Sequence, residues 1–369
     1  MSIITRYLLR QFVGPLFVCL VTFNGVFILF DLFGQLSRFI EADLPFDKVL
    51  LYYAGVICMY SHWFLPASCM LATLYSMWQL SHHNELTAMR ASGISFHRLT
   101  FPFFFVALIV GMLDWSTAEY LTPGLAAWSD KMKSSQFKAA DHERTENLLF
   151  VTENRRWRFA SVDTSDETGF ANAQTNVVIT QEIDESQSSV ISADSARYAD
   201  GIWWLSNPTF TALTSNGDFI PENNAGIAGD KAGKKSVPSF FPFPEFTETP
   251  HDMLLANREW MYLGSTDMFR ILRKTGGNNE KWVDFWYSLA APWTCIVITL
   301  FAIPAGITGA RQSIFRGIAL TFAIFFIFYG VTLSLQFFGQ HGYLPAFLAA
   351  WLPNLAFLAI GLNLYRRLT

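Results

Sequence analysis

Charged side chains are scarce in this sequence: Asp, Glu, Lys and Arg together make up 15% of its 369 residues, whereas an ordinary soluble domain carries about 25%. The scarcity is uneven. Residues 121–281 contain 22 of the 30 acidic and 16 of the 26 basic residues. This distribution excludes a soluble enzyme and a basic nucleic-acid-binding protein. We expect a charge-poor frame of net charge +2, interrupted by one polar insert of net charge −6.

Cysteine is also rare, and none of it lies in the polar insert. All four cysteines fall in apolar stretches: Cys19, Cys58, Cys69 and Cys295. A disulfide framework in the insert is therefore excluded, and this segment has to be stabilised by an ordinary hydrophobic core.

Catalytic and nucleotide-binding motifs are missing as well. The sequence has no HExxH and no GxSxG motif, so neither a zinc-protease site nor a nucleophile elbow is expected. Residues 229–236 read GDKAGKKS and resemble a phosphate-binding loop, but the glycine spacing is wrong and no apolar strand precedes them. We expect a chain without catalytic residues, cofactor or metal, in which a separate protein binds any ATP.

Long hydrophobic runs occupy the rest of the chain. A transmembrane helix needs about 20 mostly apolar residues, and six stretches qualify: 11–30, 49–80, 99–120, 285–310, 317–340 and 342–365. We predict a polytopic α-helical membrane protein with three spans, a large insert and three more spans. The expected domains are 1–121, 122–281 and 282–369.

The distribution of basic residues between the short loops predicts the orientation. With the N-terminus inside, the cytoplasmic side receives eight arginines and the opposite side only Arg38 and Lys48. The eight are Arg6, Arg10, Arg90, Arg98, Arg311, Arg316, Arg366 and Arg367. Since cytoplasmic loops carry an excess of Lys and Arg, we expect both termini in the cytoplasm and the insert on the outer side of the membrane.

Within the insert, β patterns predominate. Four short alternating or β-rich runs predict strands: 148–152, 156–162, 176–180 and 202–205. Asp200-Gly201 predicts a turn, and helical patterns occur only near 121–138 and 265–274. We expect a β-sandwich or jelly-roll of about 110 residues, with a long loop at 216–239. Its interior is either a cavity for an acyl chain or an ordinary filled core, and the pattern alone favours the filled core.

The connection between the second and third spans carries an amphipathic pattern. Leu86, Met89 and Arg90 fall on one face of a helix, and Gly93 is a natural C-terminal stop. Glu85 lies in the first turn, where the helix dipole favours an acid. Such a segment is either a helix that docks into a groove on a partner protein or a turn on the membrane surface, and the pattern alone does not separate these alternatives.

The stretch Glu85-Leu-Thr-Ala-Met-Arg-Ala-Ser-Gly-Ile-Ser resembles the cytoplasmic coupling helix of the LptF/LptG family, the lipopolysaccharide export permeases. The frame contains further matching segments: Arg6-Tyr7-Leu8, Leu65-Pro66, Glu119 to Pro123, Pro292, Pro304, Ala305 to Arg311 and Trp351-Leu-Pro353-Asn354. The insert matches mainly in position and size. The resemblance covers residues 3–125 and 265–367.

The resemblance implies how the protein works. Family members pair as an LptF–LptG heterodimer over two copies of a cytoplasmic ABC-type ATPase, which binds the ATP, and an LptC-like jelly-roll protein lies nearby. The complex extracts lipopolysaccharide from the bacterial inner membrane and passes it through periplasmic jelly-roll domains toward a periplasmic bridge. The first and fifth spans line the lateral opening for lipid.

The same resemblance implies which residues couple the permease to its ATPase. The coupling helix would lie within residues 82–95. Glu85 would contact the ATPase, and four neighbours would shape the docking helix: Leu86, Met89, Arg90 and Gly93.

One region departs from the family pattern. Some relatives carry basic residues near the outer end of the first span, suited to lipid phosphates, where this chain has Asp31. Arg38 and Lys48 lie further out and are the candidate headgroup contacts. Asp31 either pairs with Arg38 or marks the membrane interface, and the second alternative is favoured. Structural pairing is expected for three polar residues at membrane depth: His62, Asp114 and Asp284.

Two other functions compete with export. A membrane-anchored sensor or scaffold would bind a ligand with its exported domain and signal through the cytoplasmic helix. A secondary transporter is disfavoured, because the spans lack the paired intramembrane charges that usually carry ions or protons. An exporter predicts an ATPase that co-purifies with the chain, and a sensor does not.

Overall fold

The computed structural model describes residues 3–134, 144–152, 155–163, 174–184, 187–214, 219–220, 240–257, 260–307 and 314–368. The chain forms two compact units. The helical unit comprises Met1–Lys138, Tyr262–Met268 and Asn278–Thr369, and the β unit comprises Ala139–Met261 and Phe269–Gly277. The segment 229–236 and Arg311 lie outside the described residues, as does the predicted loop 216–239 except for 219–220.

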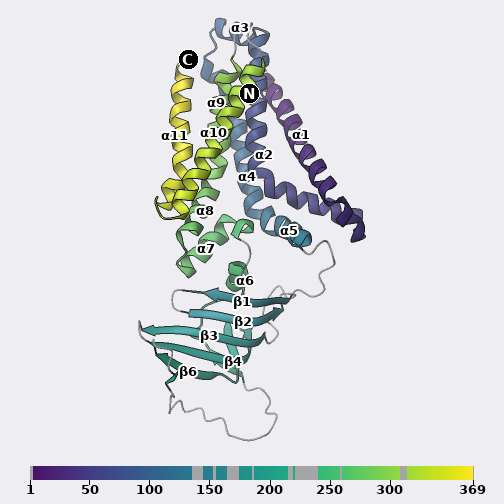
Figure 1. Cartoon of the computed structure of the whole chain (residues 1–369). Helices are drawn as coiled ribbons and strands as arrows, with labels where there is room; N and C mark the ends of the chain where they lie inside the picture. Colours follow the sequence, from purple (N-terminus) through teal and green to yellow (C-terminus); the bar gives the residue numbers. More distant parts are fainter. Residues whose placement is uncertain are drawn as a thin grey trace. The chain divides into compact units, whose positions relative to one another are not determined.

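Six helical stretches of the described chain are long and apolar enough to cross a membrane, which confirms the predicted number and the predicted 3+3 arrangement (Figure 1). They are α1 (Ile3–Glu41), α2 (Phe46–His82), α4 (Phe96–Ser116) with its extension, α8 (Asn279–Ala290) with α9 (Thr294–Gly306), α10 (Ile314–Gln340) and α11 (Ala346–Arg366). The short helix η3 (Ala291–Trp293) joins α8 to α9. Both chain ends and the short helix α3 (Glu85–Ala91) lie at one end of this unit (Figure 1).

Several of these helices extend beyond the hydrophobic runs that predict them. Helix α1 is 39 residues long, and the third span continues through a π-helix, η1 (Thr117–Ala126), into α5 (Ala127–Ser134). Apolar composition decides where a helix can cross a membrane, but backbone hydrogen bonding continues until a residue ends the helix. Conversely, Pro345 lies directly before α11, so the sixth span begins at residue 346 rather than at 342.

Helices α2 and α9 form much of the buried centre of the helical unit. In the α8–α9 span 67% of the apolar window is buried, against 6% in α1. Two glycines allow close backbone contact: a Cβ on Gly306 would lie 2.7 Å from the Leu74 carbonyl oxygen, and one on Gly111 would lie 2.3 Å from that of Pro292. Small residues permit such packing between membrane helices. All four cysteines lie in the helical unit and are free.

The β unit contains an antiparallel sheet, with eight strands in its described residues. In chain order these are β1 (Arg144–Val151), β2 (Arg155–Asp163), β3 (Gln174–Asp184), β4 (Gln187–Ala199), β5 (Ile202–Ser206), β6 (Thr209–Thr214), β7 (Phe219–Ile220) and β8 (Phe240–Phe243). The pairing order is β1-β2-β3-β4-β5-β8, with β6 paired to β4 and β7 to β6. An inserted antiparallel β domain is thereby confirmed, and the four predicted strands correspond to β1, β2, β3 and β5. Closure into a jelly-roll stays a prediction.

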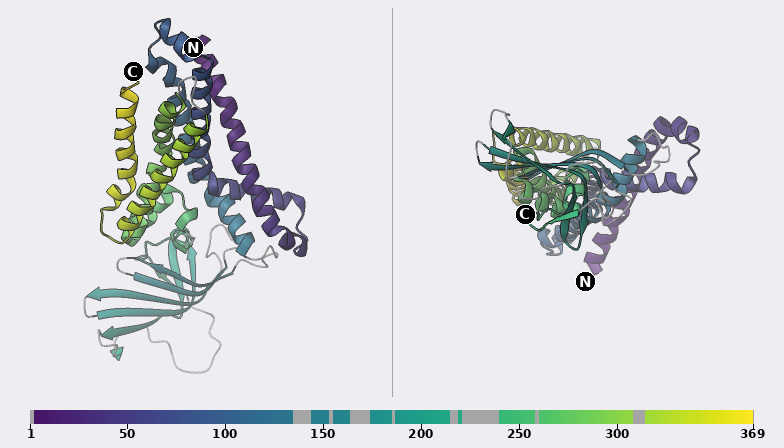
Figure 2. Two further views of the ribbon diagram at one scale, coloured as in Figure 1. Left: turned by 45° about the horizontal axis from the view of Figure 1, so that its top comes forward. Right: turned by 90° about the horizontal axis from the view of Figure 1, so that it is seen from below.

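Strand β4 pairs with two strands along one edge. Its residues 195–199 pair with β5, and its residues 187–192 pair with β6. Asp200 and Gly201 both have positive φ and form the predicted turn into β5, the conformation that an Asp-Gly pair favours in hairpins. Asn207, with φ 49°, then separates β5 from β6. The chain that runs back along β4 is therefore interrupted between β5 and β6, and both strands belong to one twisted sheet (Figure 2).

Aromatic side chains fill the core beside the sheet. Trp157 and Trp203 are fully buried, with ring centroids 5.0 Å apart, and Phe246 packs edge-on against Trp157 at 5.1 Å. Along β2 the exposed Arg158 separates two buried aromatic residues, the alternation expected of a strand with one buried face. This part of the interior is a filled core.

After β8 the β unit continues in α6 (Pro250–Asn257) and η2 (Trp260–Tyr262), followed by α7 (Ser265–Thr275), which begins in the helical unit and ends in the β unit. Within the β unit, Asp252 of α6 accepts a hydrogen bond from Lys274 of α7 and another, of 2.6 Å, from the Thr249 hydroxyl. Burial of the Asp252 carboxyl favours its neutral form, but these hydrogen bonds outweigh burial and hold its pKa below the ordinary value.

This low pKa predicts an acid-sensitive β unit. The folded carboxylate stays ionised at a pH where the unfolded chain already takes up a proton, so protonation favours unfolding. The contribution of Asp252 to stability is therefore present above the unfolded pKa of about 3.9 and is lost as pH falls below it. Unfolding of the intact protein, followed against pH, should show this loss in the wild type. The Asp252→Asn variant should lack it, and identical pH profiles would contradict the prediction.

Candidate functional site

Helix α3 forms the connection between the second and third spans. Asn84 adopts a left-handed conformation, with φ 58°, after the end of α2. Its carbonyl oxygen accepts the Ala88 N–H at 2.9 Å, which begins the new helix. Asparagine tolerates this backbone conformation better than most residues, so the chain can turn sharply here and place Glu85 in the first helical turn.

The C-terminal end of α3 is a Schellman motif. The Ile94 N–H donates to the Met89 carbonyl oxygen at 3.2 Å, and the Gly93 N–H donates to that of Arg90 at 3.0 Å. Gly93 has φ 85°, which glycine adopts without strain. The predicted stop at Gly93 is therefore confirmed, and Ile94 and Met89 pack against the same apolar cluster.

One face of α3 is anchored to the helical unit. Leu86 is only 4% exposed, and Met89 packs against the same apolar cluster, which includes Leu8, Phe96 and Leu99. The opposite face exposes small residues: Thr87, Ala88, Ala91 and Ser92. The sequence pattern correctly grouped Leu86 and Met89, but their side chains face the chain's own core. The surface available to another protein consists of the small exposed residues and the two charged ends.

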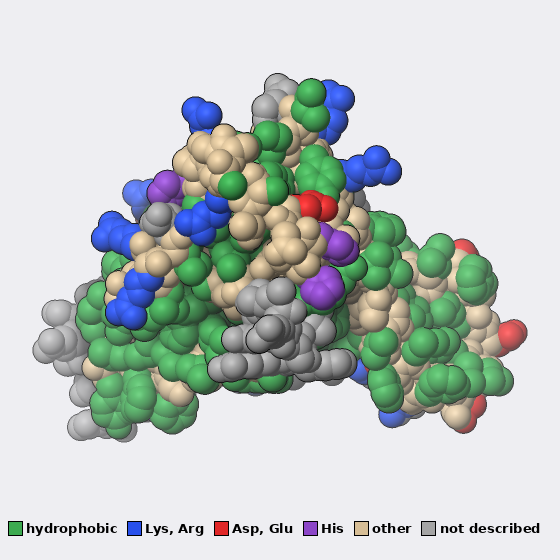
Figure 3. Space-filling view, turned by 90° about the horizontal axis from the view of Figure 1, so that it is seen from above, with side chains coloured by type: hydrophobic (Ala, Val, Ile, Leu, Met, Phe, Trp, Pro, Cys, Tyr) green, Lys and Arg blue, Asp and Glu red, His purple; other side chains and the backbone are tan. Residues whose placement is uncertain are grey.

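The two charged residues of α3 have partners elsewhere in the helical unit. The Tyr7 hydroxyl donates a hydrogen bond to the Glu85 carboxylate, with 2.6 Å between the oxygens. Arg90 is exposed, lies 5.6 Å from the centre of the Phe96 ring and donates from Nη2 to the Leu368 carbonyl oxygen at 3.3 Å. Viewed from this end, Lys and Arg side chains spread over the surface and acidic groups are few (Figure 3).

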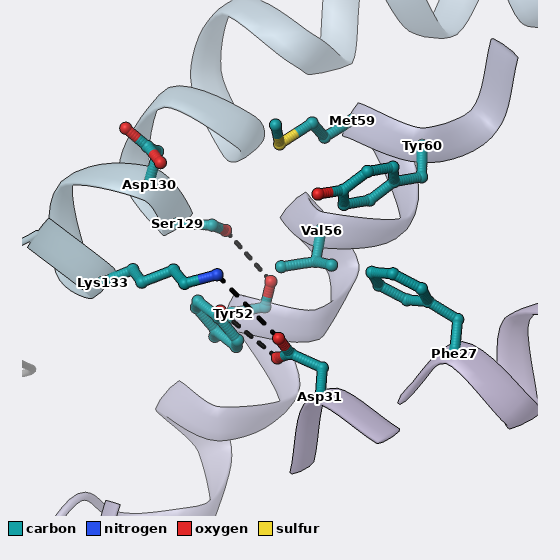
Figure 4. Close-up of a pocket in the computed structure, with 9 residues that line it drawn as sticks. All are labelled: Phe27, Asp31, Tyr52, Val56, Met59, Tyr60, Ser129, Asp130 and Lys133. Carbon is teal, nitrogen blue, oxygen red and sulfur yellow. Dashed lines mark hydrogen bonds and ion pairs between the residues drawn. The ribbon is translucent and has the colours of Figure 1, made fainter. Parts of the chain in front are cut away.

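The residues singled out as headgroup contacts lie where the first span passes into the second, Arg38 in the last turn of α1 and Lys48 in the first turn of α2. Arg38 donates to Gln35 Oε1 on its own helix at 3.0 Å, and Lys48 is exposed. Asp31 has other partners: the Tyr52 hydroxyl, at 3.4 Å, and Lys133 Nζ of α5, at 3.9 Å. Asp31, Tyr52 and Lys133 line a cavity of about 50 Å³ between α1, α2 and α5 (Figure 4).

The pairing of Asp31 with Arg38 is therefore not the one observed. The two residues are seven positions apart, and on a helix this separates them by about 10 Å along the axis. Arg38 instead reaches Gln35, one turn away, while α5 places Lys133 beside Asp31.

Two carboxyl groups of the spans, the buried Asp114 and the half-buried Asp284, have structural partners, as was expected. Asp114, 3% exposed, accepts a hydrogen bond from the Ser61 hydroxyl at 3.0 Å. Asp284 accepts one from Gln340 at 3.2 Å. The His62 ring centroid lies 5.3 Å from that of Trp63, and the His62 backbone carbonyl oxygen accepts from the Tyr329 hydroxyl at 3.4 Å.

Glu119 of η1 holds the start of α7, a role that sequence patterns did not reveal. Its Oε2 accepts from the Ser265 N–H at 2.7 Å and the Ser265 hydroxyl at 2.5 Å, and its Oε1 accepts from the Thr266 N–H at 3.1 Å. A carboxylate suits this position because a helix N-terminus presents unpaired N–H groups and a positive dipole. The partners are 146 residues away in the sequence, and no local pattern signals such a pairing.

The β unit contains a pocket of about 380 Å³, larger than the cavity beside Asp31 in the helical unit. Apolar side chains of β4, β6 and β8 line it together with a few polar ones: Gln181, Ser189, Ile191, Phe210, Pro242, Phe243, Pro244, Glu245 and Phe246. Within the described residues no group of three or more His, Cys, Asp or Glu side chains is arranged to hold a metal ion.

The sequence profile of one family, described as lipopolysaccharide export system permease LptF/LptG, matches residues 6–367. No curated protein matches the chain significantly. The profile covers nearly the whole chain, including all six helices able to cross a membrane and the β insert between them. The chain therefore belongs to the LptF/LptG family of lipopolysaccharide export permeases and is an integral inner-membrane protein.

Proposed function

We propose that this permease is the membrane subunit of an ATP-driven exporter that extracts lipopolysaccharide from the inner membrane and passes it through its β unit toward the outer membrane. The chain itself is non-catalytic and binds no cofactor; a partner ABC-type ATPase dimer binds and hydrolyses the ATP. Both termini and α3 face the cytoplasm, and the β unit lies in the periplasm. The excess of arginine in the short loops on the side of the termini supports this orientation.

The observation that carries the proposal is the construction of α3. Leu86 and Met89 fasten one face of the helix to the spans, while its other face and the Glu85 carboxylate remain accessible at the end of the unit. No described residue donates a hydrogen bond to Glu85 Oε1, and a carboxylate can accept several. Glu85 is thus suited to contact a donor on the ATPase, with Leu86, Met89, Arg90 and Gly93 maintaining the shape of the docking helix.

A second permease subunit is the natural neighbour of α1 and α10. Only 6% of the apolar window of α1 and 22% of that of α10 are buried within this chain. Large apolar side chains are exposed on both helices, among them Phe17, Phe30 and Phe33 on α1 and Phe326 and Phe338 on α10. These surfaces suit contact with acyl chains and with a homologous subunit, as expected for the first and fifth spans of an LptF–LptG heterodimer.

The β unit is proposed to carry or relay the lipid. The pocket of about 380 Å³ beside β4, β6 and β8 is lined by apolar residues such as Ile191, Phe210 and Phe243 together with polar ones such as Gln181, Ser189 and Glu245. Its apolar side chains suit contact with part of an acyl chain. An LptC-like protein would receive the lipid from this domain on the way to the periplasmic bridge. Arg38 and Lys48, on either side of the first outer loop, are the proposed contacts for lipid phosphates.

A pull-down from detergent-solubilised membranes tests the proposal. The wild-type chain should recover an ATP-binding protein, identified by mass spectrometry and by labelling with an ATP analogue. The Glu85→Ala variant should recover at least about thirtyfold less ATPase, since truncation of one partner of a buried charge pair costs about 2 kcal/mol or more. Glu41→Ala is the matched control, because Glu41 is an exposed acid at the opposite end of α1.

The sensor or scaffold alternative predicts a different result. If no ATPase accompanies the wild-type chain under conditions that retain a second permease subunit, the exporter proposal is wrong and the alternative takes its place. If Glu85→Ala recovers as much ATPase as the wild type, Glu85 is not the coupling contact, although the exporter proposal stands.

A further inference from the structure

Helix α3 is tied by polar contacts at both ends to two different parts of the helical unit. At its start the Tyr7 hydroxyl of α1 donates to Glu85 at 2.6 Å. At its end Arg90 donates to the Leu368 carbonyl oxygen, directly after α11, at 3.3 Å. The first bond is short and involves an ionisable carboxyl group, and such charge-assisted bonds are roughly twice as strong as neutral ones. The connection to α1 is therefore the firmer of the two.

The Tyr7 bond is not required to satisfy a buried polar group. Tyr7 is 41% exposed, so water can replace Glu85 as its partner at little cost. Leu86 and Met89 already hold α3 against the apolar cluster. Apolar contacts are non-directional and allow two surfaces to shift, whereas a hydrogen bond keeps two atoms at a defined distance and angle. The bond therefore adds a directional link between α3 and α1.

Helix α1 is suited to respond to such a link. Its apolar window has the smallest buried share among those of the six spans. Leu8, Phe12 and Leu16 anchor its start, so it is the part of α1 beyond Leu16 that few contacts within the chain hold in place. Tyr7 lies in the second turn of α1, and a rigid helix transmits a displacement at one end along its length. A shift of α3 at one end of the unit would in this way reach the part of α1 that borders lipid.

We infer that Tyr7 is a positioning residue that passes the movement of α3 to α1 through its hydrogen bond to Glu85. The inference rests on the proposed function, because it requires α3 to be the helix that the ATPase moves. Glu85 then has two tasks: one carboxylate oxygen accepts from Tyr7, and the other is available to the ATPase. Without the Tyr7 hydroxyl the ATPase still docks on α3, but the movement of α3 is poorly transmitted to α1, so less lipid is moved for each ATP hydrolysed.

The test measures coupling rather than activity alone. The permease pair with its ATPase is reconstituted into liposomes that contain lipopolysaccharide, and ATP hydrolysis and lipopolysaccharide removal are recorded in the same sample. Tyr7→Phe deletes only the hydroxyl. Tyr75→Phe is the matched control, because Tyr75 of α2 is 42% exposed and no described residue forms a hydrogen bond with its hydroxyl.

Tyr7→Phe should retain the ATPase in a pull-down, while the amount of lipopolysaccharide removed per ATP hydrolysed falls about tenfold or more, the effect of one hydrogen bond to a charged group. Tyr75→Phe should leave this ratio unchanged. In a Glu85→Gln background, whose amide oxygen still accepts from Tyr7, Tyr7→Phe should again lower the ratio. In a Glu85→Ala background it should add nothing, because the acceptor is gone.

The possible outcomes separate this inference from the proposed function. An unchanged ratio with the ATPase still bound overturns the role of Tyr7 and leaves the exporter intact. A parallel fall of hydrolysis and lipid removal, or loss of the ATPase from Tyr7→Phe, also overturns it, because the residue would then support folding or docking. Failure of the wild-type chain to bind any ATPase refutes the proposed function itself.

Discussion

The variant Trp203→Ala is expected to lower the free energy of unfolding of the β unit by about 4 kcal/mol. Trp203 is fully buried, and its ring centroid lies 5.0 Å from that of Trp157. Its Nε1 also donates to the Glu248 carbonyl oxygen at 2.7 Å. Truncation therefore leaves a large cavity and an unpaired buried acceptor, and both effects destabilise the fold.

Hydrogen exchange of the intact, detergent-solubilised protein measures this loss. The most protected amides of β2 to β5 should exchange about a thousandfold faster in Trp203→Ala, the factor that corresponds to about 4 kcal/mol. The neighbouring Trp204→Ala is the control, because Trp204 lies on the other face of β5 and is only half-buried. Equal acceleration in both variants would show that the aromatic core does not depend specifically on Trp203.

Removal of the Glu119 carboxylate is expected to release the start of α7. In Glu119→Ala the Ser265 and Thr266 N–H groups and the Ser265 hydroxyl lose their acceptor. Hydrogen bonds to charged groups contribute about 1.5–3 kcal/mol each, so the first turn should lose about 3 kcal/mol or more. Since the chain returns to the fourth span through α7, we also expect lipopolysaccharide export to fall.

Local hydrogen exchange again gives the measurement. The amides of Ser265 and Thr266 should exchange about a hundredfold faster in Glu119→Ala, and Glu119→Gln should have an intermediate effect because it keeps one acceptor oxygen. Glu280→Ala provides the comparison, since Glu280 is an exposed acid in the first turn of α8. Protection of α7 equal to that of the wild type would contradict the assigned role of Glu119.

The spans and α3 could be predicted because their determinants are close together in the sequence. Each span needs one continuous apolar run, and the lack of water in the bilayer makes a helix nearly obligatory for it. The end of α3 depends on Gly93, whose positive φ and hydrogen bonds involve residues within one turn. The turn at Asp200-Gly201 is local in the same sense.

Strand β4 shows where local patterns fail. Its sequence, QSSVISADSARYA, is rich in serine and alanine, residues that alone do not favour a strand. It is nevertheless the longest strand of the sheet described, because β3 pairs along one edge and β5 and β6 along the other. Hydrogen bonds from three neighbours override the weak intrinsic preference.

The sequence by itself determined the six membrane-crossing helices, the β character of the insert and the amphipathic helix between the second and third spans, because short-range periodicity and apolar content decide these features. Only the tertiary structure decided which distant side chains meet: Tyr7 with Glu85, Asp31 with Lys133, and Glu119 with Ser265. The physical reason is that such contacts depend on how whole helices pack. Packing is the sum of many weak, non-directional interactions along each helix, and no single residue pair encodes it.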